Sequence, residues 1–153
     1  MTVLPFTDAA ALREFMFAGK AKLTIKSLKT GKHYTYKIRR SPDTDTLWFV
    51  HRLAGDSNYI YLGTIYPDDR QFQPTRKTAA IYKSCPSFKG FEWFYRRLTD
   101  DQAIPPGIEV THEGRCGMCG RELTDPVSVA EGYGPECRSK RLRRGLMHDR
   151  KTS

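Results

Sequence analysis

The alternation of hydrophobic and polar residues in the first hundred positions predicts a set of antiparallel strands. Residues 22–27 and 33–39 alternate with a period of two on either side of the turn 29–32, which predicts a hairpin with one apolar face and one basic face. Residues 47–53 and 59–66 are apolar on both faces, as is typical of strands in the middle of a sheet. Residues 78–82 predict a fifth strand at an edge.

Apolar residues at helical spacing predict a helix before these strands and another after them. The first runs from a cap at Thr7 to about Ala18, with Gly19 placed to end it. The second runs from a cap at Ser87 to about Leu98. Together these elements predict an α+β fold, in which an antiparallel sheet of four or five strands carries two helices on one face.

The run Pro105-Pro106-Gly107 predicts a rigid hinge between two domains. An α+β domain would span residues 1–104, and a small zinc-finger module ending in a basic helix would span 108–153. Apolar residues are few in the module, and a segment of about 40 residues usually needs a metal or a disulfide to fold. Asp125 and Pro126 predict a short helix that runs to about Glu131 and ends at Gly132.

Four residues of the module have the spacing of a tetrahedral zinc site, H-x3-C-x2-C-x17-C. These candidate ligands are His112, Cys116, Cys119 and Cys137. The histidine is predicted as the fourth ligand because it closes the smallest loop, with His148 and Cys85 as alternatives. Two disulfides fit poorly because Cys85 lies far upstream of the other three cysteines, and inert buried thiols are the remaining alternative.

A zinc ion with four protein ligands has no position for water, so the predicted role of the metal is structural and the protein is not expected to be an enzyme. Zinc deaminases combine H-x-E with a later P-C-x-x-C. Here no proline precedes the C-x-x-C, and Cys137 stands alone. A metalloenzyme would need a water-ligated metal.

The chain has a formal net charge of +9, and much of it lies in residues 138–153, where seven basic residues accompany a single acidic one. This surplus predicts binding to DNA or RNA, with a solvated tail as the alternative. The predicted phosphate-binding residues are Arg115, Arg121, Arg138, Lys140, Arg141, Arg143 and Arg144.

A second basic surface is predicted on the outer face of the hairpin, where phosphates can contact Lys22, Lys26, Lys37 and Arg39. The neighbouring aromatic residues Trp48, Tyr59 and Tyr61 either stack on bases or belong to the core.

The sequence lacks two features that would direct a protein out of the cytoplasm or into a membrane. Residues 1–10 lack the basic and apolar runs of a signal peptide, and no apolar stretch reaches the roughly 18–20 residues that cross a bilayer. With thiolate ligands for a metal, the chain is expected in a reducing cytoplasm without membrane contact.

The module resembles a short zinc-finger domain of unknown function found at the C-termini of small phage and mobile-element proteins. The resemblance rests on His112-Glu113-Gly114-Arg115-Cys116, Cys119-Gly120-Arg121, Leu123-Thr124-Asp125-Pro126, Ser128 and Gly132-Tyr133-Gly134-Pro135-Glu136-Cys137. Upstream, the runs 19–21, 30–32, 61–64 and 91–93 are similar to the N-terminal part of the same proteins.

The resemblance implies a phage or mobile-element origin, hence the cytoplasm of a host cell, and it implies that His112 and the three cysteines form the metal set. That family has no settled activity. Two functions are therefore expected: a zinc-stabilised nucleic-acid-binding accessory protein, or a phage inhibitor that binds a host defence complex, such as an anti-CRISPR-like protein.

Overall fold

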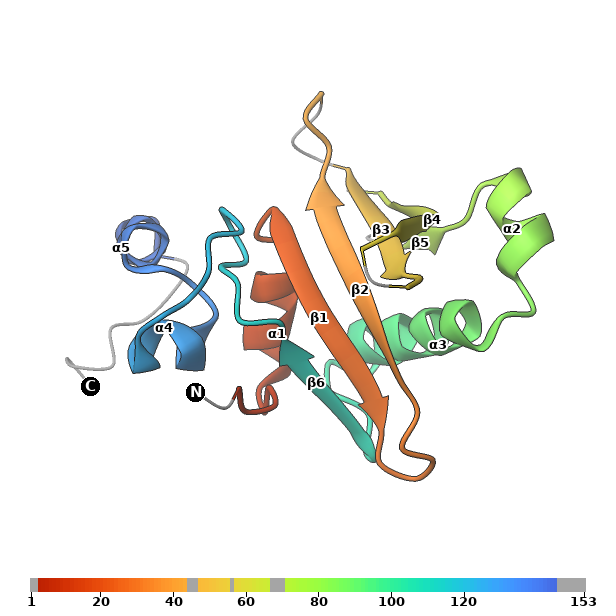
Figure 1. Ribbon diagram of the computed structural model, residues 1–153, viewed down its shortest axis with the longest axis horizontal. Helices are drawn as coiled ribbons and strands as arrows, with labels where there is room; N and C mark the ends of the chain where they lie inside the picture. The colour runs from red at the N-terminus through yellow and green to blue at the C-terminus, as the bar shows by residue number, and fades with distance from the viewer. Residues whose placement is uncertain (1–2, 44–46, 56, 67–70, 146–153) are drawn as a thin grey trace.

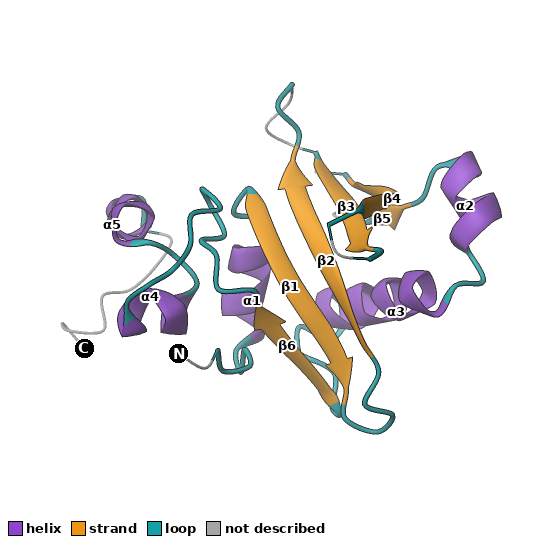
Figure 2. Cartoon of the chain, in the orientation of Figure 1, coloured by secondary structure: helices purple, strands orange, loops and turns teal. Residues whose placement is uncertain are grey.

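A computed structural model describes residues 3–43, 47–55, 57–66 and 71–145 of the chain. Its centre is a six-stranded antiparallel sheet with the strand order β5-β4-β3-β2-β1-β6 (Figure 1, Figure 2). The strands are β1 (Lys20–Ser27), β2 (His33–Arg40), β3 (Trp48–Leu53), β4 (Tyr59–Ile65), β5 (Phe72–Gln73) and β6 (Ile108–His112). The α+β class is confirmed, with one strand more than the largest predicted number.

One face of the sheet is covered by α1 (Ala9–Met16) and α3 (Pro86–Asp100), which lie behind it in Figure 1. Alternation directs Leu23 and Ile38 of the hairpin to this face, where both are fully buried. The Tyr36 ring packs at a tilt against Phe91 of α3, and its hydroxyl donates to the Ser87 carbonyl at 2.6 Å. The core therefore lies between the sheet and these two helices.

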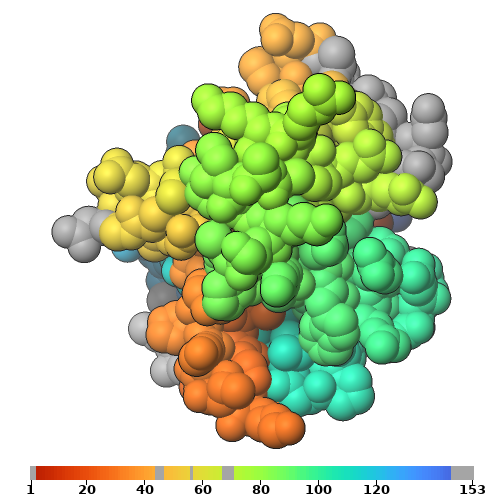
Figure 3. All heavy atoms as spheres, turned by 90° about the vertical axis from the view of Figure 1, so that its right-hand side faces the viewer, coloured from red at the N-terminus to blue at the C-terminus, as the bar shows by residue number. Residues whose placement is uncertain are grey.

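No helix among the described residues covers the opposite, open face of the sheet (Figure 1). Strands β3 and β4 lie in the middle of the sheet, as their two apolar faces predict. Phe49, His51 and Tyr61 pack against one another on the open face and are only half-buried. In Figure 3 the end of the β3–β4 hairpin projects on the open-face side, away from α3.

The predicted edge strand at residues 78–82 is instead part of a helix, α2 (Arg76–Tyr82). Thr75 and Thr78 form a reciprocal capping box, in which each side chain accepts from the other's backbone N–H. This cap satisfies free backbone donors and stabilises a helix against the strand preference of the sequence. The short strand β5 takes the edge position, and α2 lies at the end of the molecule that faces the viewer in Figure 3.

Strand β6 follows directly after the predicted hinge and pairs with β1 from Leu23↔His112 to Ser27↔Ile108. The sheet therefore runs across the predicted domain boundary, and the division into residues 1–104 and 108–153 stays a prediction. Beyond β6, α4 (Pro126–Glu131) forms as its cap residues predict, and α5 (Pro135–Arg143) corresponds to the predicted basic helix. Among the described helices, none has the length and apolar character needed to cross a bilayer.

Candidate metal centre

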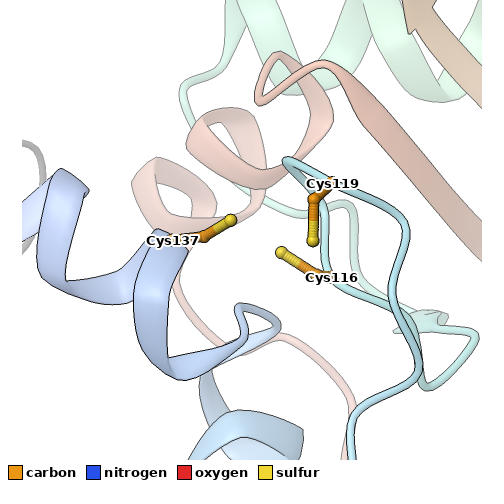
Figure 4. Close-up of side chains that lie close together, drawn as sticks. All are labelled: Cys116, Cys119 and Cys137. Atoms are coloured by element: carbon orange, nitrogen blue, oxygen red, sulfur yellow. The ribbon is translucent and has the colours of Figure 1, made fainter.

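Three of the four predicted ligands converge in the structure. Cys116 and Cys119 come from a tight turn after β6, and Cys137 lies in the first turn of α5. Their sulfur atoms all lie within 4.8 Å of one another, and Figure 4 shows the three side chains pointing toward a common centre. All three thiols are free, so the structure contains no disulfide among them.

The turn that carries the first two cysteines is held by backbone hydrogen bonds. The Gly120 N–H donates to the Cys116 carbonyl at 2.9 Å, and the Cys116 N–H donates to the Arg121 carbonyl at 2.8 Å. Gly120 has a φ of 79°, which glycine adopts without strain. A closed loop with this geometry presents both sulfurs to one side, as a metal-binding turn requires.

A second turn places Cys137. Asp125 caps α4 by accepting from the Ser128 N–H at 3.1 Å, and Gly132 ends the helix in the left-handed conformation. The Gly132 carbonyl then accepts from Gly117 N–H at 2.9 Å, which ties the end of α4 to the cysteine turn. Pro135 starts α5 two residues before Cys137.

One aromatic ring of α1, that of Phe15, packs against the module. The Phe15 side chain packs so closely on two glycines that an added Cβ at Gly117 would lie 2.7 Å from the ring, and one at Gly132 would lie 2.9 Å from it. Phe15 also contacts Tyr133, with ring centroids 6.0 Å apart. The first helix therefore shapes the turn that holds the sulfurs.

The three thiols differ in their readiness to ionise. Burial is the largest single influence on Cys116 and opposes ionisation, but the N–H groups of Gly134, Cys119 and Met118 together lower its pKa. Burial and the neighbouring Cys116 raise the pKa of Cys137 to about 12. Cys116 therefore loses its proton more readily than Cys137, and a divalent cation would favour the ionised form of all three thiols.

The donor set fits zinc. Zinc–sulfur bonds of about 2.3 Å in a tetrahedral shell place sulfurs about 3.8 Å apart, within the spacing of this cluster. Three cysteines with two on a glycine-containing turn are also a common structural zinc arrangement. Three clustered cysteines, two of them buried, thus form a potential metal site.

The structure differs from the prediction at His112, which it does not bring into the cluster. One ring nitrogen, Nε2, lies 2.6 Å from the Val129 carbonyl, and the other, Nδ1, accepts from the Gly114 N–H at 3.0 Å. The ring is 4% exposed and packs against Phe6 and Phe15. Burial chiefly lowers its pKa, so a neutral imidazole connects the end of β6 to α4.

Neither alternative to His112 is seen as a fourth ligand of the cysteine cluster within the described residues. Cys85 sits at the N-terminus of α3, outside the cluster, and His148 lies outside the described residues. The periodicity of Ile108, Val110 and His112 is the signal that would have placed the histidine on the inward face of a strand.

The predicted phosphate-binding residues separate into two groups. Arg141 is only 4% exposed, donates to Glu14 at 2.9 Å and lies 4.5 Å from the centre of the Tyr133 ring, so the structure places its guanidinium against protein groups and its contact with phosphate stays a prediction. Arg138 is paired with Glu131 at 2.5 Å. The other five are exposed and are called here the module cations: Arg115, Arg121, Lys140, Arg143 and Arg144.

Residues 109–142 match the model of a family of unknown function (DUF6011). The match runs from β6 into α5 and includes all three cysteines. No curated protein and no solved structure matches the chain. The resemblance of the C-terminal segment to a domain of unknown function is confirmed at this level, while the phage or mobile-element origin stays a prediction.

Proposed function

We propose that this protein is a non-enzymatic nucleic-acid-binding protein whose C-terminal module is stabilised by zinc. The observation that carries the proposal is the exposure of the five module cations around the cysteine cluster. Within the described residues, none of the five forms an ion pair. Unpaired cations gathered on one small module are the electrostatic pattern that attracts phosphates.

The geometry of α5 supports this role because its two kinds of residue point in different directions. Cys137 and Arg141, one helical turn apart, face the cluster and α1 and are buried. Lys140, Arg143 and Arg144 are exposed. A metal bound to Cys137 would therefore fix the orientation of the three outward cations.

A structural role for the metal is supported by the chemistry around it. Among the described residues, the group of potential ligands contains thiols alone, without a carboxylate or an imidazole to serve as acid or base. The module also buries little apolar surface of its own, chiefly Leu123, Val129 and Tyr133. A metal ion would stabilise such a segment.

The proposal is tested by titrating the zinc-loaded protein into labelled single- and double-stranded DNA and RNA at several salt concentrations. Replacing Lys140, Arg143 and Arg144 by Glu is expected to weaken binding at least about tenfold and to reduce the salt slope by about two to three. The matched control carries the same change to Glu at three exposed cations of the α2–α3 region, Lys77, Lys83 and Lys89. It is expected to bind nucleic acid almost as the parent does.

Lack of binding by the parent at low salt would contradict the proposal. The basic module would then be assigned to a protein partner, the second function that the sequence predicts.

A further inference from the structure

The open face of the sheet carries two rows of side chains that cross four strands. Strand pairing aligns one row as Lys22, Lys37, His51 and Tyr61. The adjacent row is Lys20, Arg39, Phe49 and Thr64. In both rows the cations come from β1 and β2, and the first row ends in aromatic residues from β3 and β4. The face is thus basic on one half and largely aromatic on the other.

The basic half places like charges directly opposite each other. Lys22 pairs with Lys37, and Lys20 pairs with Arg39, in two neighbouring positions of one hairpin. Such pairs destabilise a sheet, so packing gives no reason for them. Burial chiefly lowers the pKa of Lys37, and the charges of Lys22 and Arg39 lower it further, as expected where positive charge is crowded. An anion bound at this place would relieve the repulsion.

The aromatic half lies within reach of the same cations. The Lys37 ammonium is 4.5 Å from the centre of the Tyr59 ring, and that of Lys22 is 5.6 Å from it. On the adjacent strands the His51 and Tyr61 rings lie 5.5 Å apart. These rings are half-buried and no described helix covers them, so part of each remains accessible.

We propose that this open face binds single-stranded nucleic acid, with bases stacked on Tyr59 and Tyr61 and phosphates held by Lys22, Lys37 and Arg39. The inference rests on the proposed function and names its ligand and a second binding surface beside the module cations. Unpaired bases offer flat faces for stacking, which a duplex hides inside its helix. Four strands span about 15 Å, enough for about two or three bases.

The test compares variants at Tyr59 on two classes of probe. The probes are labelled oligo(dT) and oligo(U) of about 12 nucleotides, and a labelled hairpin duplex. Tyr59→Ala is expected to weaken single-strand binding about tenfold while changing duplex binding less than about twofold. Tyr59→Phe keeps the ring and is expected to bind as the parent does. The preferred oligomer distinguishes DNA from RNA.

Two further comparisons guard against a general loss of structure or charge. Trp93→Ala removes an aromatic side chain that is 45% exposed on α3, away from the open face, and is expected to leave binding unchanged. Lys37→Glu is expected to weaken single-strand binding, whereas Lys89→Glu on α3 is not. Photocrosslinking of the unmodified protein to a halogenated oligonucleotide is expected to label the peptide that contains Tyr59 and Tyr61.

The outcomes separate this inference from the proposed function. If the parent binds single strands and Tyr59→Ala binds them equally well, with crosslinks confined to the module, the open face is not the site and the proposed function stands. The same holds if the parent binds only the duplex. If the parent binds no probe, both are overturned.

Discussion

Individual cysteines differ in what they contribute, and this difference gives the most direct test of the metal centre. Cys116→Ser or Cys137→Ser removes one of three clustered sulfurs, so we expect the stoichiometric zinc of the parent to be lost. Cys85→Ser is the matched control because this cysteine lies at the start of α3, where its side chain makes no capping bond. Zinc is measured by mass spectrometry after dialysis. Equal zinc in all variants would rule out the cluster as the site.

His112 is expected to act through the fold and not through the metal. Its ring fills a buried space and makes two hydrogen bonds to the backbone, so His112→Gln should lower the free energy of unfolding by about 2–3 kcal/mol. The zinc content should be unchanged. Chemical denaturation together with metal analysis checks both parts, and loss of zinc in this variant would restore the histidine as a ligand.

The same residue predicts a pH dependence. The folded ring has a lowered pKa, while an unfolded histidine titrates near 6.5. The unfolded chain therefore takes up the proton first, so the stability present above the unfolded pKa is lost as the pH falls through that value toward the lower folded pKa. We expect a flatter pH profile for His112→Gln at saturating zinc. Parallel profiles for the two proteins would argue against a neutral buried ring.

At the level of elements, the contact between α1 and the cysteine turn depends on the absence of a side chain. Gly117→Ala would place a Cβ 2.7 Å from the Phe15 ring, and we expect it to destabilise the protein by about 1–3 kcal/mol. Gly90→Ala is the control, since nothing lies within 4 Å of its added Cβ in α3, and it should stabilise the protein slightly. Urea denaturation compares the two, and equal stability would contradict the packing described.

Elements with a local signal could be predicted from the sequence. The β1–β2 hairpin follows from alternation, and α4 follows from the cap at Asp125 and the stop at Gly132. Two of the missed elements, α2 and β6, have weaker signals. The cap at Thr75 favours the helix α2, although the residues after it have the pattern of a strand. Strand β6 has only five residues and is stabilised by pairing with β1, which is distant in the sequence.

The residues of the candidate site also fall into those that the sequence could predict and those that it could not. Three cysteines are identified by spacing alone, because the turn and α5 bring them together over a short stretch of chain. The partners of His112 are backbone groups of Gly114 and Val129, and the partner of Arg141 is Glu14. The contacts with Val129 and Glu14 depend on tertiary packing, which the spacing of residues around the cysteines does not encode. A histidine close to two cysteines therefore resembles a ligand, and a buried arginine resembles its exposed neighbours.

For the molecule as a whole, the shared sheet determines how far the effect of metal removal should extend. Strand β6 is part of the sheet, whereas the turn, α4 and α5 depend on the cluster and on the contact with Phe15. We expect chelation of zinc to increase amide hydrogen exchange in residues 113–145 while β1 to β4 stay protected. Loss of protection throughout the sheet would show that the two predicted domains unfold as one.

The pairing of Glu14 with Arg141 joins residues 127 positions apart. The glycines against which the neighbouring Phe15 packs, Gly117 and Gly132, are nearly as far along the chain. On a ribosome that adds roughly 5–20 residues per second, α1 would emerge about 6–25 seconds before the segment that covers it. During that interval the Phe15 ring lacks its partners in the module, Gly132 and Tyr133, and for most of it one edge of β1 lacks β6. The nascent chain is therefore expected to be most vulnerable to chaperone capture and aggregation just before its last cysteine leaves the exit tunnel.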